Sequence, residues 1–404
     1  MKHTRFALGS MLLLGVMFTL HPAQAWAQQA APAQAAPSMA ARNVTPNTNL
    51  VSPEVHPDGT VTFRIWAPDA KNVKVFSAEG TKAVPGTTAE QAKIAEAGVP
   101  LVKSEDGVWT ATLGPFPPGA YRYTFQVDGV STTDPKNPAS SETLNAVRSL
   151  YVIPGNFSDV KDVPHGSVSS VYYQSKTLGR TRRMHVYLPP GYESGTSSYP
   201  VFYLLHGAGD CDDSWTSVGR ANFIVDNLIA AGQAKPMIIV MPAGHVTDHF
   251  EMNAMRTAAT ADPFGADLMN DIIPYVEHHY RVTADPQHRA IAGLSMGGMQ
   301  TLNAVVTHPG FFSYVGVFSS GWFGGTLEQV EKTDLAALQS PEKKAVKLFW
   351  FSTGKLDIAL PNTGPSIELL KKYGYKPEFH ESEGFHEWNN WRDYLHEFTP
   401  LLFQ

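Results

Sequence analysis

Gly293-Leu294-Ser295-Met296-Gly297-Gly298 stands between an apolar, strand-like segment at 289–292 and a run at 299–308 that is typical of a helix. Pro309-Gly310 then ends that run. Glycine tolerates backbone conformations that other residues avoid, so the glycines on either side of Ser295 permit a tight, strained turn. The stretch predicts a strand, a sharp turn and a helix, with the serine hydroxyl lifted clear of a sheet.

The sequence around this stretch alternates, from about residue 165 onward, between apolar strand candidates and helical patterns. The strand candidates cover 184–188, 201–205, 237–241, 289–292, 314–319, 347–352 and 376–380, and the helix candidates cover 221–231, 264–280, 299–308, 366–373 and 387–402. Such alternation predicts an α/β domain with a mostly parallel sheet covered by helices on both faces. Ligands bind such sheets at the carboxyl ends of the strands, which is where Ser295 falls.

Residues 51–155 have a different pattern, in which short alternating strands are separated by turn signals. The clearest strand candidates are 61–66, 73–76, 107–113 and 121–127. About seven strands at this spacing predict an all-β, immunoglobulin-like sandwich of about 100 residues. We expect this domain to precede the α/β domain, which then occupies 156–404.

Residues 1–25 have the pattern of a cleavable secretory signal. Lys2 and Arg5 precede a mostly apolar stretch at 7–20, and Ala23-Gln24-Ala25 is a small-x-small cleavage site. The apolar stretch is short for a membrane span, and no other segment approaches the roughly 20 apolar residues that a span needs. We therefore expect a secreted or periplasmic protein, not bound to a membrane after cleavage, with an Ala-, Gln- and Pro-rich linker at 26–50.

The composition indicates a globular protein and bears on which ligands it can bind. The chain has 404 residues, of which 43% are hydrophobic and 17% charged, as is ordinary for a globular protein. A formal net charge of -6 gives no reason to expect a nucleic-acid partner and disfavours a highly anionic substrate. The single cysteine, Cys211, rules out an internal disulfide and is interpreted as a spare thiol or small filler. Composition leaves the oligomeric state open.

A serine hydroxyl is a poor nucleophile at neutral pH and needs a base within hydrogen-bond reach and a group that orients this base. A Gly-x-Ser-x-Gly turn between a strand and a helix is the nucleophile elbow of α/β-hydrolases, in which an acid and then a histidine follow the serine along the chain. His386 is the predicted base, because it lies between a strand and a helix and Gly384 permits a sharp turn there. The other downstream histidines lie at a helix end or inside regular elements: His308, His380 and His396.

The acid is expected in the loop after the preceding strand. The segment 347–352 leads into Thr353-Gly354-Lys355-Leu356-Asp357, which places Asp357 at the carboxyl end of that strand. Its role would be to fix the imidazole tautomer and to stabilise the imidazolium. Glu381 and Glu383, which precede His386 closely, remain the alternatives.

The tetrahedral intermediate of acyl transfer needs N–H donors for its oxyanion. One is predicted to be the backbone N–H of Met296, directly after the serine, and the second to come from the loop that follows 201–205. Ala208 is the predicted second donor, with Gly207 and Gly209 as neighbouring alternatives. One histidine beside glycines, His206, is not a metal-ligand set, so no metal is expected.

Together, these residues resemble the esterase D-like family, which includes feruloyl and acetyl xylan esterases, enterochelin esterases, S-formylglutathione hydrolases and mycolyltransferases. The resemblance spans about 165–404 and rests on Leu204-Leu205-His206-Gly207…Trp215, the serine elbow, Asp357 and Gly384-Phe385-His386-Glu387-Trp388…Trp391-Arg392. Ahead of it, Phe63-Arg64-Ile65-Trp66-Ala67-Pro68, Gly119-Ala120-Tyr121-Arg122-Tyr123 and Asp134-Pro135 resemble an early-set, glycogen-binding-like sandwich. The resemblance implies ester hydrolysis through an acyl-enzyme, without metal or organic cofactor.

Aromatic and small residues near the predicted catalytic groups are candidates for the substrate pocket. These candidates are His206, Gly207, Trp322, Phe323 and Trp388. Apolar walls with few polar groups suit an aromatic acyl group. The loop 243–263 matches no specificity pattern that we can assign, and whether the sandwich binds carbohydrate or only supports the fold is left open.

The predicted function is that of a serine esterase that releases hydroxycinnamoyl groups from plant cell-wall polysaccharide. An acetyl xylan esterase and a siderophore trilactone esterase share the chemistry, and the latter would need a cationic pocket for which Arg220 and Arg256 are the candidates. An acyltransferase differs only in the acceptor. A carbohydrate-binding protein with a silent hydrolase domain is the alternative from another class, and the intact Ser295, Asp357 and His386 set disfavours it.

Overall fold

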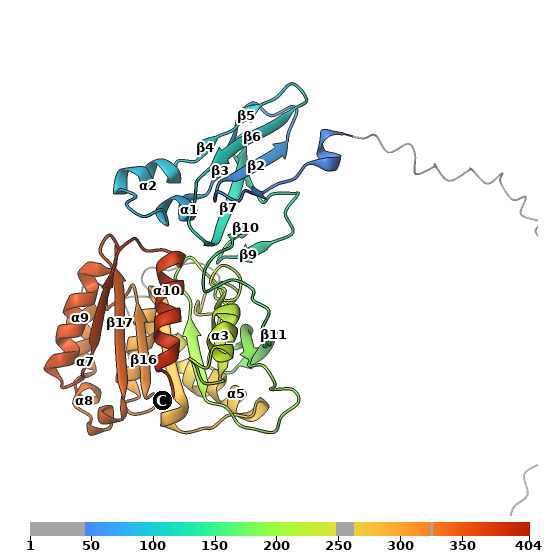
Figure 1. Cartoon of the computed structure of the whole chain (residues 1–404). Coiled ribbons are helices and arrows are strands. Elements are labelled where there is room, and N and C mark those ends of the chain that lie inside the picture. The colour runs from blue at the N-terminus through green and yellow to red at the C-terminus, as the bar shows by residue number, and fades with distance from the viewer. Residues whose placement is uncertain (1–44, 248–261, 324–325) are drawn as a thin grey trace, which may run out of the picture. The chain divides into compact units, whose positions relative to one another are not determined.

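The protein is described by a computed structural model for residues 45–247, 262–323 and 326–404 (Figure 1). The predicted signal segment and residues 26–44 of the predicted linker lie outside these described residues. The same holds for 248–261 of the loop whose role the sequence left open. Among the described residues, no helix is long and apolar enough to cross a bilayer.

An eight-stranded sheet carries Ser295 and has the strand order β11-β12-β14-β13-β15-β16-β17-β18. The six strands from β14 to β18 are parallel, whereas β12 pairs antiparallel with both β11 and β14. The strands are β11 (Ser167–Ser175), β12 (Arg180–Leu188), β13 (Val201–Leu205), β14 (Ile238–Pro242), β15 (Arg289–Leu294), β16 (Tyr314–Phe318), β17 (Leu348–Gly354) and β18 (Glu378–Ser382). The mostly parallel α/β sheet is therefore confirmed.

Helices cover both faces of this sheet (Figure 1). They are α3 (Ala221–Ala230), α4 (Pro263–Asp267), α5 (Ile273–His279), α6 (Met296–Thr307), α7 (Thr326–Thr333), α8 (Leu335–Leu338), α9 (Leu360–Lys372) and α10 (Trp388–Phe398). Every residue of β13, β14, β15 and β16 is buried, which explains why these strands are continuous apolar runs. By contrast, β11 lies at the edge of the sheet and is mostly exposed, so its polar sequence gave no strand signal.

The predicted helix at 264–280 is interrupted. A π-helical turn, Leu268–Ile272, separates α4 from α5. Pro274 lacks an N–H, and its ring would clash with the carbonyl group four residues earlier, so the chain cannot continue as a regular α-helix through this point.

A two-sheet β-sandwich precedes the α/β domain, as predicted. One sheet has the order β1-β2-β6-β5 and the other β4-β3-β7-β10-β9, with β8 paired to β7. The strands are β1 (Glu54–Val55), β2 (Val61–Trp66), β3 (Val73–Phe76), β4 (Val99–Pro100), β5 (Val102–Lys103), β6 (Val108–Leu113), β7 (Gly119–Val127), β8 (Val130–Thr132), β9 (Ser140–Glu142) and β10 (Val147–Ile153). Two helices that the sequence analysis did not predict, α1 (Ala78–Lys82) and α2 (Ala89–Glu96), lie between β3 and β4.

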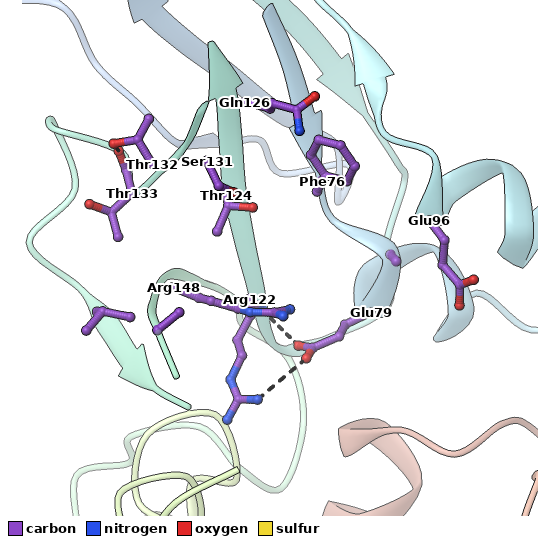
Figure 2. A pocket seen from close by; sticks show the side chains of 13 residues that line it. Phe76, Glu79, Glu96, Arg122, Thr124, Gln126, Ser131, Thr132, Thr133 and Arg148 are labelled. Carbon is purple, nitrogen blue, oxygen red and sulfur yellow. Dashed lines mark hydrogen bonds and ion pairs between the residues drawn. The ribbon is translucent and has the colours of Figure 1, made fainter. Parts of the chain in front are cut away.

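The outer side of β7 borders a hollow of about 610 Å³, which Figure 2 shows. Thr124 and Gln126 of β7, Phe76 of β3 and Arg148 of β10 are among its lining residues. The inner side of the same strand packs into the sandwich core with Phe63 and Tyr151.

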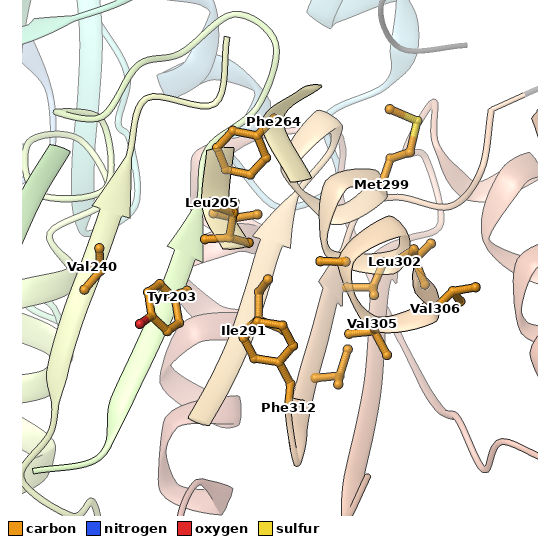
Figure 3. Close-up of a cluster of buried hydrophobic side chains, with 14 of the residues drawn as sticks. Tyr203, Leu205, Val240, Phe264, Ile291, Met299, Leu302, Val305, Val306 and Phe312 are labelled. Atoms are coloured by element: carbon orange, nitrogen blue, oxygen red, sulfur yellow. The ribbon is translucent and has the colours of Figure 1, made fainter. Parts of the chain in front are cut away.

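The core of the α/β domain consists of two clusters of buried side chains. In one of them, Leu302, Val305 and Val306 of α6 pack toward Tyr203 of β13 and Ile291 of β15 (Figure 3). The second cluster joins α3 and α10 to the opposite face of the sheet. These contacts fix α6, and with it the serine at its beginning, against the ends of the central strands.

Candidate active site

Ser295 occupies a strained turn between β15 and α6. Its backbone angles are φ 51° and ψ -116°, a conformation that residues with a side chain rarely adopt. A Cβ atom on Gly293 would lie 2.4 Å from the backbone of Gly297, and a Cβ on Gly297 would lie 2.6 Å from the carbonyl oxygen of His206. Glycine is therefore required at both positions, because no larger residue fits the crossing of β15, α6 and the loop after β13.

His386 and Asp357 are paired. The Nδ1 atom of His386, in the loop between β18 and α10, lies 2.8 Å from Oδ1 of Asp357, in the loop after β17. The Asp357 carboxylate is buried and also accepts a 2.7 Å hydrogen bond from the backbone N–H of Ala359. A carboxylate only accepts, so Nδ1 carries the imidazole proton and Nε2 can take up another.

The two glutamates considered as alternative acids lie elsewhere. Glu383 is exposed and forms an ion pair with Lys355. Glu381 is exposed on β18. Asp357 is thus the carboxylate that the structure brings to His386.

Ser295 and His386 line one cavity of about 510 Å³. Gly207, Ala208 and Trp388 line the same cavity, so these predicted residues come together from three loops at the carboxyl ends of strands. A nucleophile and a base thus share this cavity, and the carboxylate that orients the base is hydrogen-bonded to it, so the groups needed for acyl transfer are available.

The candidate oxyanion donors flank the serine. Met296 is the first residue of α6, where backbone N–H groups have no intrahelical partner. A Cβ atom on Gly207 would lie 3.4 Å from the Cβ of Ser295, so the backbone before Ala208 passes directly beside the elbow. The structure therefore leaves both predicted donors, Met296 and Ala208, close to the serine.

His206 is placed as a structural residue. It is buried, and its Nε2 atom accepts a 2.7 Å hydrogen bond from the backbone N–H of Gly244. Its Nδ1 lies 2.8 Å from the carbonyl oxygen of Gly207, and burial lowers its pKa. A neutral His206 thus joins the loops after β13 and β14, and it is not among the residues that line the cavity with Ser295. Among the described residues, no group of three or more potential ligands is arranged to hold a metal ion.

Two aromatic candidates are not brought to this cavity. Trp322 is buried beneath α6 and donates a 2.9 Å hydrogen bond from its indole to Oδ1 of Asn303. Phe323 packs against the same core cluster. The reason is that the chain turns toward α9 after β16, where the backbone N–H of Trp322 donates to the hydroxyl of Ser366.

Cys211 and Arg220, which the sequence analysis singled out, are buried or partly buried away from Ser295. Burial raises the pKa of the Cys211 thiol to about 12, which suits an unreactive filler. Arg220 is buried and donates a 2.7 Å hydrogen bond from Nε to the carbonyl oxygen of Ser158, so it does not line this cavity. Arg256 lies outside the described residues.

The sandwich supplies part of the cavity wall, which the sequence analysis did not anticipate. The lining residues from the sandwich are Ala78, Glu79, Lys82, Glu96, Arg122, Thr143 and Arg148. Arg122 of β7 is held there by a 2.7 Å ion pair with Asp210, in the loop after β13, and its guanidinium lies over the ring of Trp388. A charged residue in the middle of an otherwise apolar strand could have indicated a contact with another domain. The sequence near Arg122 does not show, however, that its partner is Asp210.

The chain matches two families. Residues 175–402, more than half of the chain, match the Esterase family, and residues 51–141 match carbohydrate-binding module 48, the isoamylase N-terminal domain.

The chain is also similar to individual proteins named as esterases. An endo-1,4-beta-xylanase/feruloyl esterase of Xylanibacter ruminicola is 35% identical over 364 residues, which are 87% of this chain and 46% of the relative. The chain thus spans about half the length of that relative. A solved ferulic acid esterase is 28% identical with a TM-score of 0.51 and covers 59% of this chain and 97% of its own. An enterochelin esterase from Shigella flexneri covers 85% of this chain and 92% of its own with a TM-score of 0.60, and at 17% identity it shows a shared fold alone.

Proposed function

The chain belongs to the Esterase family and is a carboxylic ester hydrolase with the α/β-hydrolase fold and an N-terminal β-sandwich, and on that premise we propose that it releases hydroxycinnamoyl groups from plant cell-wall polysaccharide. The observation that carries the proposal is a strained serine that shares a cavity with a carboxylate-paired histidine. The 35% and 28% identities to proteins named as feruloyl and ferulic acid esterases support the choice of acyl group.

In the first half of the reaction, Nε2 of His386 takes the proton of the Ser295 hydroxyl as Oγ attacks the ester carbonyl carbon. The carbonyl electron pair moves onto its oxygen, which accepts hydrogen bonds from the backbone N–H groups of Met296 and Ala208. As the intermediate collapses, the bond to the alcohol oxygen breaks and His386 returns its proton to the leaving alkoxide.

In the second half, water replaces the alcohol. His386 takes a proton from the water molecule as the water oxygen attacks the carbonyl carbon of the acyl-enzyme. The bond to Ser295 Oγ then breaks, His386 returns the proton to Ser295, and the hydroxycinnamic acid leaves. Asp357 stabilises the imidazolium, because its buried oxygen accepts from Nδ1 at 2.8 Å.

The sandwich hollow supports a polysaccharide as the alcohol part. It shares Glu79, Glu96, Arg122 and Arg148 with the cavity of Ser295, and its wall also carries hydroxyl and amide groups (Figure 2). Hydroxyls, amides and charged groups are the partners that sugar hydroxyls use. The match to a carbohydrate-binding module supports the same role for this domain.

The acyl group is tested by comparing methyl ferulate with 4-nitrophenyl acetate as substrates of the full chain. The proposal predicts turnover of both esters. Turnover of the acetate alone would keep the serine esterase and replace the feruloyl group by an acetyl group, as in an acetyl xylan esterase.

Export is a second part of the proposal, and it rests on the sequence of residues 1–25. Expression of the full chain in a bacterial host with a secretory system should yield a mature protein that begins after Ala25 or Ala27. An uncleaved chain in the cytoplasm would contradict export without affecting the proposed chemistry.

A further inference from the structure

Glu387 is a buried carboxyl group that lines the cavity of Ser295 and that the reaction described above does not use. The residue is 4% exposed, and its Oε2 atom has no hydrogen-bond partner among the described residues. It precedes α10 directly, yet its side chain does not cap this helix. A buried polar atom without a partner costs folding free energy, so a group retained at the wall of a cavity is a candidate for contact with a ligand.

The charges around Glu387 come from three elements. Glu79 and Lys82 belong to α1, Arg392 belongs to α10, and Asp357 follows β17. These two cations are already engaged, since Lys82 lies 2.5 Å from Glu96 and Arg392 donates to the carbonyl oxygens of Ala120 and Val218. Arg122, which lines the same cavity, is paired with Asp210.

Burial first, and then the neighbouring Glu79, raise the pKa of Glu387 to about 8. At neutral pH the side chain is therefore mostly a carboxylic acid, with one hydroxyl donor and one carbonyl acceptor. This pair of roles matches a sugar hydroxyl, which also donates once and accepts.

We propose that Glu387 is a specificity-determining residue that donates its carboxyl proton in a hydrogen bond to a hydroxyl oxygen of the sugar bearing the ester. The inference rests on the proposed function, because it assigns the alcohol part of the same substrate. The alcohol part is favoured over the acyl part by the polar wall beside Glu387, which is built from Glu79, Lys82 and Arg122. An aromatic acyl group prefers apolar surroundings.

The test uses the full chain and two esters of the same acid, a feruloylated arabinoxylo-oligosaccharide and methyl ferulate. The measured quantity is the ratio of their KM values, taken at pH values from about 6 to about 9.5. For Glu387→Ala at neutral pH we expect this ratio to rise about 10-fold over that of wild type, as expected for one lost hydrogen bond. Thermal unfolding of each variant shows whether it is folded.

Glu387→Gln is the matched variant, because an amide keeps both a donor and an acceptor at every pH. We expect its KM ratio to stay within about twofold of the wild-type ratio at neutral pH. In wild type the ratio should change as the pH passes about 8 and the carboxyl group becomes a carboxylate, whereas in Glu387→Gln it should not. Glu383→Gln, an exposed neighbour outside the cavity, should follow wild type at every pH.

Equal changes of KM for both esters in Glu387→Ala, or no change for either, would overturn the inference while leaving the proposed function intact. A wild-type ratio that does not depend on pH would overturn it too. If wild type hydrolysed neither ferulate ester, the proposed function would fail, and this inference with it.

Discussion

The cavity of Ser295 has two walls, one built by the α/β domain (the hydrolase wall) and one built by the β-sandwich (the sandwich wall). Different interactions hold the side chains of these two walls in place. Gly207 and Ser295 follow the paired parallel strands β13 and β15, and His386 follows β18 of the same sheet, so all three lie at the carboxyl edge of one sheet. Arg122 lies on a strand of another sheet and is held by an ion pair to Asp210, 88 residues away along the chain. The chemistry thus rests on the sheet topology, and the shape of the opposite wall rests on individual polar contacts between domains.

The largest effect should come from the hydrolase wall. Ser295→Ala removes the nucleophile and should lower kcat on methyl ferulate by about 10³-fold or more. The alanine keeps the Cβ atom, so the thermal unfolding midpoint should stay near that of wild type. Turnover that survives in the variant would break the assignment of this wall to the chemistry.

Asp357→Asn should lower kcat by about 10²- to 10⁴-fold, because an amide no longer fixes the imidazole tautomer. His386→Ala should cost at least as much, since it removes the base itself. Glu383→Gln, in which an exposed carboxyl is replaced, serves as the control and should retain full activity. If Asp357→Asn were active and Glu383→Gln inactive, Glu383 and not Asp357 would be the acid that orients His386.

Arg122→Ala probes the sandwich wall. It leaves the carboxylate of Asp210 buried without its cation, so the free energy of unfolding should fall by about 3–5 kcal/mol in urea titrations. Arg64→Ala, in which the partly exposed pair with Glu54 is lost on the same sandwich, should change it by only about 0–1 kcal/mol. If both variants lost the same free energy of unfolding, the ion pair between the two domains would contribute no more to stability than a partly exposed pair.

Glu387→Gln tests, through the pH dependence of stability, whether the cavity wall contains a buried acid. The folded pKa of about 8 lies above the ordinary value of 4.5, so the folded state holds this proton more tightly than the unfolded state. The resulting stability is fully present below about pH 4.5 and is lost as the pH rises to about 8. The free energy of unfolding of wild type should therefore fall relative to that of Glu387→Gln over this interval, by roughly 1–4 kcal/mol. A difference that is constant across the interval would contradict the burial of an acid at this position.

The same contrast explains what could be predicted from sequence. The elbow, the buried strands and the loop positions of Asp357 and His386 follow from local patterns and chain order, and the structure pairs these two residues as expected. Edge strand β11 gave no signal because its residues are mostly exposed. Pro361 and Pro365 concealed the first turns of α9, which begins at Leu360 rather than at 366.

Side-chain environments were harder to predict than elements. Trp322 follows a strand at the correct edge of the sheet, yet it turns inward to Asn303, because the direction of a loop depends on packing that is distant in sequence. The contribution of Arg122 and Glu79 to the cavity depends in the same way on contacts between two domains. Glu387 could be recognised only once its burial was known.

The most direct test of the proposed acyl-enzyme is to react the full chain with a serine-directed fluorophosphonate and to locate the label by peptide mass spectrometry. We expect one equivalent of label on Ser295, loss of esterase activity in proportion to labelling, and no label in Ser295→Ala. Labelling of another residue, or full turnover of methyl ferulate by an enzyme that is completely labelled at Ser295, would contradict a mechanism that proceeds through this serine.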